Sequence, residues 1–112
     1  MTLASVATGT KTTDGTEQSL ASWTSGKTCV LLLDLTTMAG GTTPDVLQVV
    51  AYVKVLSGST KAKFLDVQYV GGLIPANVVI SVPVPALHYG EFTIKELQGA
   101  HNDIDWEILS ID

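Results

Sequence analysis

Residues 46–70 have the sequence VLQVVAYVKVLSGSTKAKFLDVQYV, and this stretch decides the fold class. Apolar residues recur at every second position of 46–56, and β-branched valines at this period favour a strand over a helix. The Ser-Gly-Ser-Thr sequence at 57–60 is typical of a tight turn, after which 61–70 returns as the partner strand. We therefore predict a β-hairpin over 46–70.

Four further segments have the composition of strands, and turn-forming residues separate them: 28–35, 77–85, 91–97 and 103–111. We find no 12-residue stretch with a helical period. Regularly spaced short strands are typical of sandwiches and jelly rolls. The sequence therefore predicts an all-β fold, an antiparallel β-sandwich of jelly-roll-like type with seven to eight strands.

The segment 77–85 contains two prolines two positions apart, Pro83 and Pro85. Because proline has no N–H group to donate to a neighbouring strand, we expect this segment at a sheet edge. Its alternation predicts that one face carries Val78, Ile80, Val82 and Val84.

The 112 residues are enough for one domain, because two halves would each be too small to hold a core. Residues 1–26 are rich in Thr, Ser, Ala and Gly, and predict an extended N-terminal arm or weak edge strands. Residues 27–112 predict the single β-sandwich domain. We expect no signal peptide, and no apolar run approaches the roughly 20 residues that a membrane span needs.

The chain has few charges for its apolar content. Charged residues make up 15% and apolar residues 46%, with fourteen threonines, whereas about 25% charged residues is average. This balance favours a surface that copies of the chain or a partner partly cover. An ordinary β-domain with a threonine-rich surface is the alternative.

The net charge of −5 comes from the end of the chain. Residues 1–90 contain five lysines and five acids, whereas 91–112 contain six acids and only Lys95. There is no arginine. Because nucleic-acid binders neutralise phosphates with Lys and Arg, we expect no nucleic-acid partner.

An acidic strand near the C-terminus is the best candidate for a metal site. Asp103, Asp105 and Glu107 share one face, and His101 is close in sequence. However, residues two apart on a strand are separated by roughly 6.6 Å, too far for all three carboxylates to reach one ion. We expect a solvated polar face and no metal or other cofactor.

We expect no catalytic residues. Cys29 falls in the most apolar strand, where burial makes a thiol inert. Glu91 and Glu96 would form a glycosidase pair only if a cleft brought them about 5–10 Å apart. No serine lies in a strand–turn–helix elbow and no glycine motif cradles a phosphate, so we predict a protein that is not an enzyme.

Aromatic residues leave one binding alternative. Tyr52 lies on the polar face of its strand and is the best exposed platform for stacking against a sugar, whereas Trp106 lies on the apolar stripe of the last strand. A small carbohydrate-binding β-module is therefore the second hypothesis.

Four segments resemble small structural proteins of tailed bacteriophages. They are VLLLDLT at 30–36 with Met-Ala-Gly at 38–40, AYVKV at 51–55, FTIKELQG at 92–99 and DWEI at 105–108. The resemblance covers roughly residues 27–112, and the loop at 40–45 is longer than in that family. It implies a jelly-roll or β-sandwich virion protein that decorates or cements a capsid, or belongs to the head–tail connector.

The resemblance also implies partners and a location. The partners would be the major capsid protein or other virion proteins, and the chain itself would form a homo-oligomer, with a trimer favoured. The protein would be made in the host cytoplasm and reside in the virion. As an assembly contact we predict the apolar loop Leu73-Ile74-Pro75, which follows a strand end.

Overall fold

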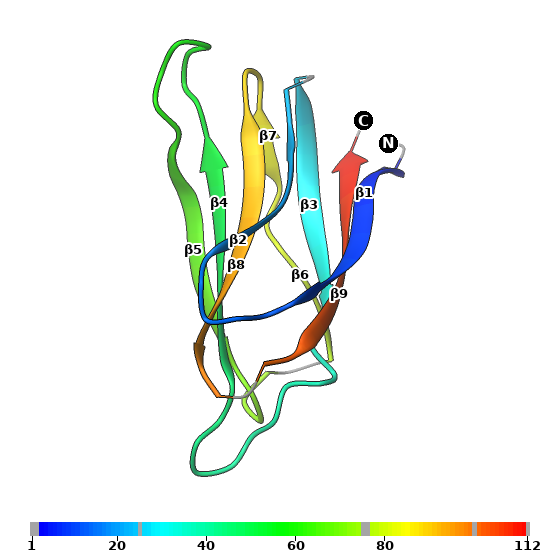
Figure 1. Cartoon of the computed structure of the whole chain (residues 1–112). Coiled ribbons are helices and arrows are strands. Elements are labelled where there is room, and N and C mark those ends of the chain that lie inside the picture. Colours follow the sequence, from blue (N-terminus) through cyan, green and yellow to red (C-terminus); the bar gives the residue numbers. More distant parts are fainter. Residues whose placement is uncertain (1–2, 25, 75–76, 100, 112) are drawn as a thin grey trace.

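The structure, a computed structural model, describes residues 3–24, 26–74, 77–99 and 101–111. In this part of the chain nine strands form two antiparallel sheets that face one another (Figure 1), so the predicted all-β sandwich is confirmed. The strands are β1 (Leu3–Thr12), β2 (Gln18–Trp23), β3 (Lys27–Asp34), β4 (Val46–Val53), β5 (Ala62–Val70), β6 (Val78–Ile80), β7 (Val84–Ala86), β8 (Gly90–Gln98) and β9 (Asp103–Ile111).

The two sheets divide the strands five and four. Sheet A has the order β1-β9-β3-β6, with β7 also paired to β3, and sheet B has the order β2-β8-β4-β5. The described residues include no helix of the length and apolar character that a membrane crossing would require. The jelly-roll type of connection stays a prediction.

The predicted hairpin is confirmed: β4 and β5 pair antiparallel along their whole length. Leu47, Val49 and Ala51 are at most 3% exposed and belong to the core between the sheets. A bulge after Ala51 shifts the register, and Tyr52 is half-buried on the outer face. Val50 shares that outer face and is nevertheless only 3% exposed, so the outside of sheet B is partly covered by its own side chains.

The core fills the space between the inner faces of the sheets. Each fully buried aliphatic or aromatic side chain stabilises the fold by about 1.5–3 kcal/mol relative to an exposed position. The largest apolar side chains under 2% exposed are Phe92, Leu31, Leu35, Ile94, Ile104, Ile108, Val49 and Val84. They come from both sheets, which is what holds the two layers together.

The described part of the N-terminal segment forms two strands, β1 and β2. Among the described residues β1 pairs only with β9, at one edge of sheet A, and β2 pairs only with β8, at one edge of sheet B. The loop between them therefore carries the chain from one sheet to the other (Figure 1). In the described part of residues 1–26, both strands therefore lie at sheet edges.

The segment 77–85 lies at a sheet edge, as its prolines predicted, but it forms two strands, which raises the count from the predicted seven or eight to nine. Ile80 pairs with Leu32, whereas Val84 pairs with Cys29, a shift of one residue in register. Such a shift reverses the face of every following side chain. The prediction that the four valine and isoleucine side chains share a face is therefore wrong at Val84.

Ser81 explains the shift. Its N–H group donates to the carbonyl oxygen of Leu31 at 2.9 Å, and its side-chain Oγ accepts from the N–H group of Leu31 at 2.9 Å. A side-chain oxygen thus replaces a backbone carbonyl in the ladder, so the backbone leaves the strand and returns one residue out of register. As a result Val84 is fully buried, while Val78 and Ile80 are more than half exposed.

Candidate functional site

The acidic residues of β9 lie on the outer face of sheet A. Ile104 and Ile108 of the same strand are fully buried, so the alternating residues Asp103 and Asp105 point away from the core. Threonine hydroxyls of β1 donate to both carboxylates: Thr12 to Asp103 at 2.5 Å and Thr10 to Asp105 at 2.6 Å. Among the described residues no three His, Cys, Asp or Glu side chains are placed to hold a metal ion.

His101 does not join the acidic row but belongs to a polar cluster at one end of the sandwich, hereafter the polar lock. Its Nδ1 lies 3.0 Å from Oε2 of Glu96, whose side chain is 6% exposed. The Thr13 hydroxyl donates to the same oxygen at 2.6 Å and accepts from the Asn102 amide at 2.8 Å. Asn102 Nδ2 in turn donates to the Asp45 carboxylate at 3.0 Å. The polar lock therefore ties several loops together beneath the surface.

Glu91 and Glu96 lie on opposite faces of β8. Glu91 pairs with Tyr52, on the outer face of sheet B, whereas Glu96 pairs with Leu47, a core residue. A sheet therefore separates the two carboxylates, and they do not form the paired-acid site considered from the sequence.

A hydrogen-bonded network covers the outer face of sheet B, and Glu17 is at one side of it. Glu17 Oε2 accepts from the hydroxyls of Thr93 and Tyr52, both at 2.7 Å. The bonds from Thr93 and then Tyr52 hold the pKa of Glu17 below its ordinary value, and the bond to Glu17 raises the pKa of Tyr52 to about 12. These partners are 76 and 35 positions apart in sequence, so no local pattern could have indicated them.

Glu91 lies at the other side of this network. Its side chain is 8% exposed, and it accepts from Lys61 Nζ at 2.6 Å and from the Tyr89 hydroxyl at 3.1 Å. Burial acts to raise the pKa of Glu91, but the hydrogen bonds from Lys61, Ser19 and Tyr89 together outweigh it and lower the pKa. The outer network is thus Glu17, Tyr52, Lys61, Tyr89, Glu91 and Thr93.

Tyr52, the predicted sugar platform, is a member of this network. Lys61 Nζ lies 4.6 Å from the centroid of its ring, so an ammonium group occupies one ring face. Its hydroxyl is committed to Glu17. Trp106 is half-buried and packs against the core, with its ring against Gly9 of β1. A stacked sugar would therefore have only the other face of Tyr52, and the sugar-binding alternative stays a hypothesis.

Two further predicted residues have clear positions. Cys29 is fully buried in β3, in the apolar surroundings from which thiol inertness was predicted. In the predicted contact loop, Leu73 is 79% exposed, Ile74 packs partly buried against the core, and Pro75 lies outside the described residues. Ile74 thus has a core contact that the sequence did not indicate, and the assembly role of the loop stays a prediction.

Large apolar side chains also lie outside the core. Ten of them in the described residues are 42% to 79% exposed, so packing within the chain leaves them largely uncovered. They are Leu3, Val55, Leu56, Phe64, Leu73, Val78, Ile80, Val82, Leu87 and Leu97.

Comparison with known proteins gives no match: no protein-family model, no curated protein and no solved structure matches this chain.

Proposed function

We propose that this protein is a non-enzymatic virion structural protein of a tailed bacteriophage that decorates or cements the assembled head. The observation that carries the proposal is the set of exposed large apolar side chains on a sandwich that already has an apolar core between its sheets. In a chain with only 15% charged residues, such a surface suits contacts with other protein surfaces.

The buried carboxylates support a binding role over a catalytic one. Glu91 is held by Lys61 and Tyr89, and Glu96 by Thr13 and His101, so both are engaged in cross-links within the chain. Such cross-links stiffen the outer network and the polar lock. A stiff surface loses little conformational entropy when it binds a repeating lattice, and this favours affinity.

On this proposal the partners are the major capsid protein or another virion protein, together with further copies of the chain, with a trimer favoured. The protein would be made in the host cytoplasm and would end in the virion. The exposed Leu73 is the proposed contact with the lattice, next to the core-packed Ile74 that fixes its loop.

The test uses the full chain and purified heads of the phage that encodes it. We expect the protein to sediment with heads and to saturate at a fixed ratio to the major capsid protein. Leu73→Asp should weaken this binding, and Leu87→Asp is the matched control, because Leu87 is a similarly exposed leucine at 72%. A protein that stays in the supernatant at every concentration overturns the proposal. Electron micrographs of bound heads distinguish a decoration protein from a head–tail connector component.

A further inference from the structure

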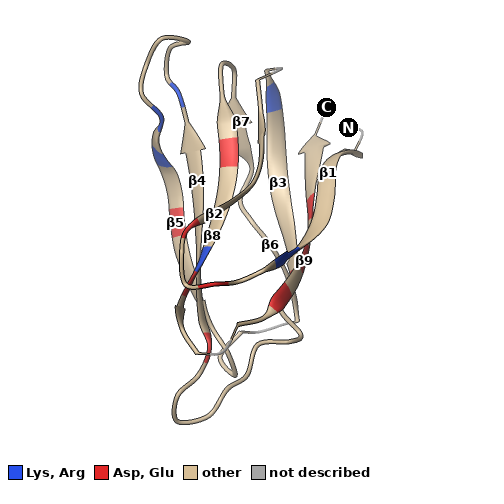
Figure 2. Cartoon of the chain, in the orientation of Figure 1, with Lys and Arg blue, Asp and Glu red and all other residues tan. Residues whose placement is uncertain are grey.

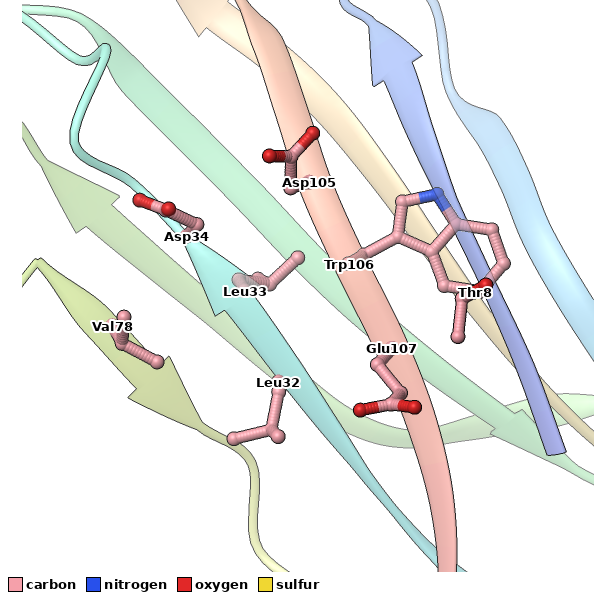
Figure 3. Close-up of a pocket in the computed structure, with 8 residues that line it drawn as sticks. All are labelled: Thr8, Leu32, Leu33, Asp34, Val78, Asp105, Trp106 and Glu107. Carbon is pink, nitrogen blue, oxygen red and sulfur yellow. The ribbon is translucent and has the colours of Figure 1, made fainter. Parts of the chain in front are cut away.

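A shallow groove of about 330 Å³ lies on the outer face of sheet A and crosses β1, β9, β3 and β6 (Figure 3). In one row of paired residues Glu107 lies beside Leu32. In the next row Asp105 lies beside Asp34, and Asp34 lies beside Val78. Its walls therefore combine carboxylates with apolar side chains, and we name it the acidic groove.

Two carboxylates of the acidic groove are bound by threonines, and among the described residues none of its carboxylates takes part in an ion pair. Asp105 accepts from the Thr10 hydroxyl and Asp34 from the Thr36 hydroxyl, and the bond from Thr36 lowers the pKa of Asp34, which keeps it charged. None of the ion pairs in the described part of the chain includes Asp34, Asp105 or Glu107. Because like charges directly opposite one another in a sheet repel, a cation from outside would stabilise this face.

The connection between β4 and β5 is basic and apolar, and it therefore complements the acidic groove. This hairpin tip, residues 54–61, carries Val55 at 78% exposure and Leu56 at 65%, with no acid and with a lysine at each end. Lys61 is paired with Glu91, so Lys54 is the lysine that can reach a partner. Lys54 Nζ lies 5.0 Å from the ring centroid of Tyr89 and forms no ion pair within the described residues. Figure 2 shows the basic residues of this hairpin and the acidic residues of β9 in different parts of the molecule.

We propose that the hairpin tip of one copy docks in the acidic groove of a second copy, with Val55 and Leu56 against Leu32 and Val78, and Lys54 near the carboxylates. The occupant is a second copy because the tip supplies the cation that the groove lacks, together with exposed apolar side chains. The tip belongs to sheet B and the groove to sheet A, and in Figure 1 the β4–β5 connection lies at the opposite end of the sandwich from the end of β3 and the start of β9. One chain cannot bring its own tip to its own groove. The contact joins unlike surfaces, so repeated contacts close into a ring or extend into a line.

This contact forms between copies of the chain alone and does not depend on the head binding proposed above. The test is sedimentation velocity of the full chain in low-salt buffer over a range of concentrations. We expect reversible association that weakens as the salt concentration rises, because the lysine and the carboxylates attract one another. Leu56→Asp on the tip and Val78→Asp in the groove should each weaken association at least about tenfold.

Mixing the two variants gives the decisive result. Leu56→Asp keeps an intact groove and Val78→Asp keeps an intact tip, so the mixture should form a one-to-one dimer that grows no further. Leu87→Asp, at an exposed leucine outside both surfaces, should associate like the unchanged chain. Lys54→Glu and Asp105→Lys serve as second tip and groove variants, and circular dichroism checks that every variant folds.

Three results would overturn the contact: an unchanged chain that stays monomeric at all concentrations, a mixture that associates no more than either variant alone, or an equal loss in Leu87→Asp. Head binding is measured separately by sedimentation with heads. A loss of self-association with intact head binding removes only this contact, and the reverse result removes only the proposed function.

Discussion

Replacement of Gly90 by alanine tests how tightly the core is packed at the start of β8. A β-carbon at Gly90 would overlap the six-membered ring of the Trp23 indole, most severely at Cζ2. Trp23 is 5% exposed, packs against Phe92 with ring centroids 5.6 Å apart, and donates its Nε1–H to the Lys27 carbonyl at 3.1 Å. The ring therefore cannot tilt away without losing contacts on its other sides.

The expected magnitude follows from this close contact. Overpacking a well-filled core costs about 1–3 kcal/mol of unfolding free energy. For a domain of this size 1 kcal/mol lowers Tm by about 5 °C, so Gly90→Ala should lower Tm by roughly 5–15 °C. Gly58→Ala is the matched control, because no heavy atom lies within 4 Å of its added carbon. That change should leave stability unaltered or raise it slightly by restricting the unfolded chain.

The assay is urea unfolding followed by tryptophan fluorescence, with thermal unfolding by circular dichroism. A second change, Trp23→Phe, removes the atoms that overlap and should cost less in the Gly90→Ala background than in the unchanged chain. The difference between the two costs is the coupling free energy of the pair. If Gly90→Ala is as stable as Gly58→Ala, or if the coupling free energy is zero, Trp23 does not pack against Gly90 in this way.

Three further predictions concern the polar groups and the thiol. The folded-state pKa of Glu91 is lowered, so its contribution to stability is present above about pH 4.5 and is lost as the pH falls. In the unchanged chain the urea concentration at the unfolding midpoint should therefore decrease at acidic pH, and Glu91→Gln should make this decrease smaller. An equal decrease in both proteins would contradict the prediction. Thr13→Val should lower the free energy of unfolding by about 1–3 kcal/mol, measured with urea, because it removes a buried hydroxyl from the polar lock. Thr10→Val removes an exposed hydrogen bond to Asp105 and should lower it by less than about 0.5 kcal/mol. Equal losses would refute the greater contribution of the buried bond. Cys29 should react with thiol reagents only on global unfolding, so rapid labelling of the native protein would show that β3 is more open than described.

The hairpin over 46–70 could be predicted because its information is local. Alternating apolar residues fix which face of each strand is buried, and the intervening Ser-Gly-Ser-Thr turn brings the two strands side by side. The proline pair likewise acts through its own missing N–H groups, so the edge position of 77–85 followed from two residues. In both cases the physical cause lies within a few positions of the effect.

The register shift in the same edge segment could not be predicted, because it depends on a distant partner. Ser81 leaves the ladder through its two bonds with Leu31, which is 50 positions earlier in the chain. In sequence Ser81 looks like any polar residue in an alternating strand. The buried position of Val84 follows from that contact and not from the local period.

The surfaces were predictable only in part, for the same reason. The period of β9 placed Asp103, Asp105 and Glu107 together on an outer face, and the structure agrees. The presence of Asp34 beside Asp105 depends on how β3 and β9 align, which no single strand encodes. The acidic groove and the outer network are both products of such alignments.

The two outer faces of the sandwich differ in whether their carboxylates are paired with cations of the same chain. On sheet B the carboxylates of Glu17 and Glu91 are held by hydroxyls and by the Lys61 ammonium, and Asp66 pairs with Lys63 at 3.2 Å. On sheet A, Asp105 accepts from the Thr10 hydroxyl and Asp34 from the hydroxyl and backbone N–H of Thr36, and the groove also holds Val78, which is more than half exposed. A surface whose charges are already paired gains little from a partner, whereas an unpaired acidic and apolar surface gains both ion pairing and burial. If this protein works by assembly, sheet A is therefore the face that a partner should cover, and sheet B the face that should remain in water.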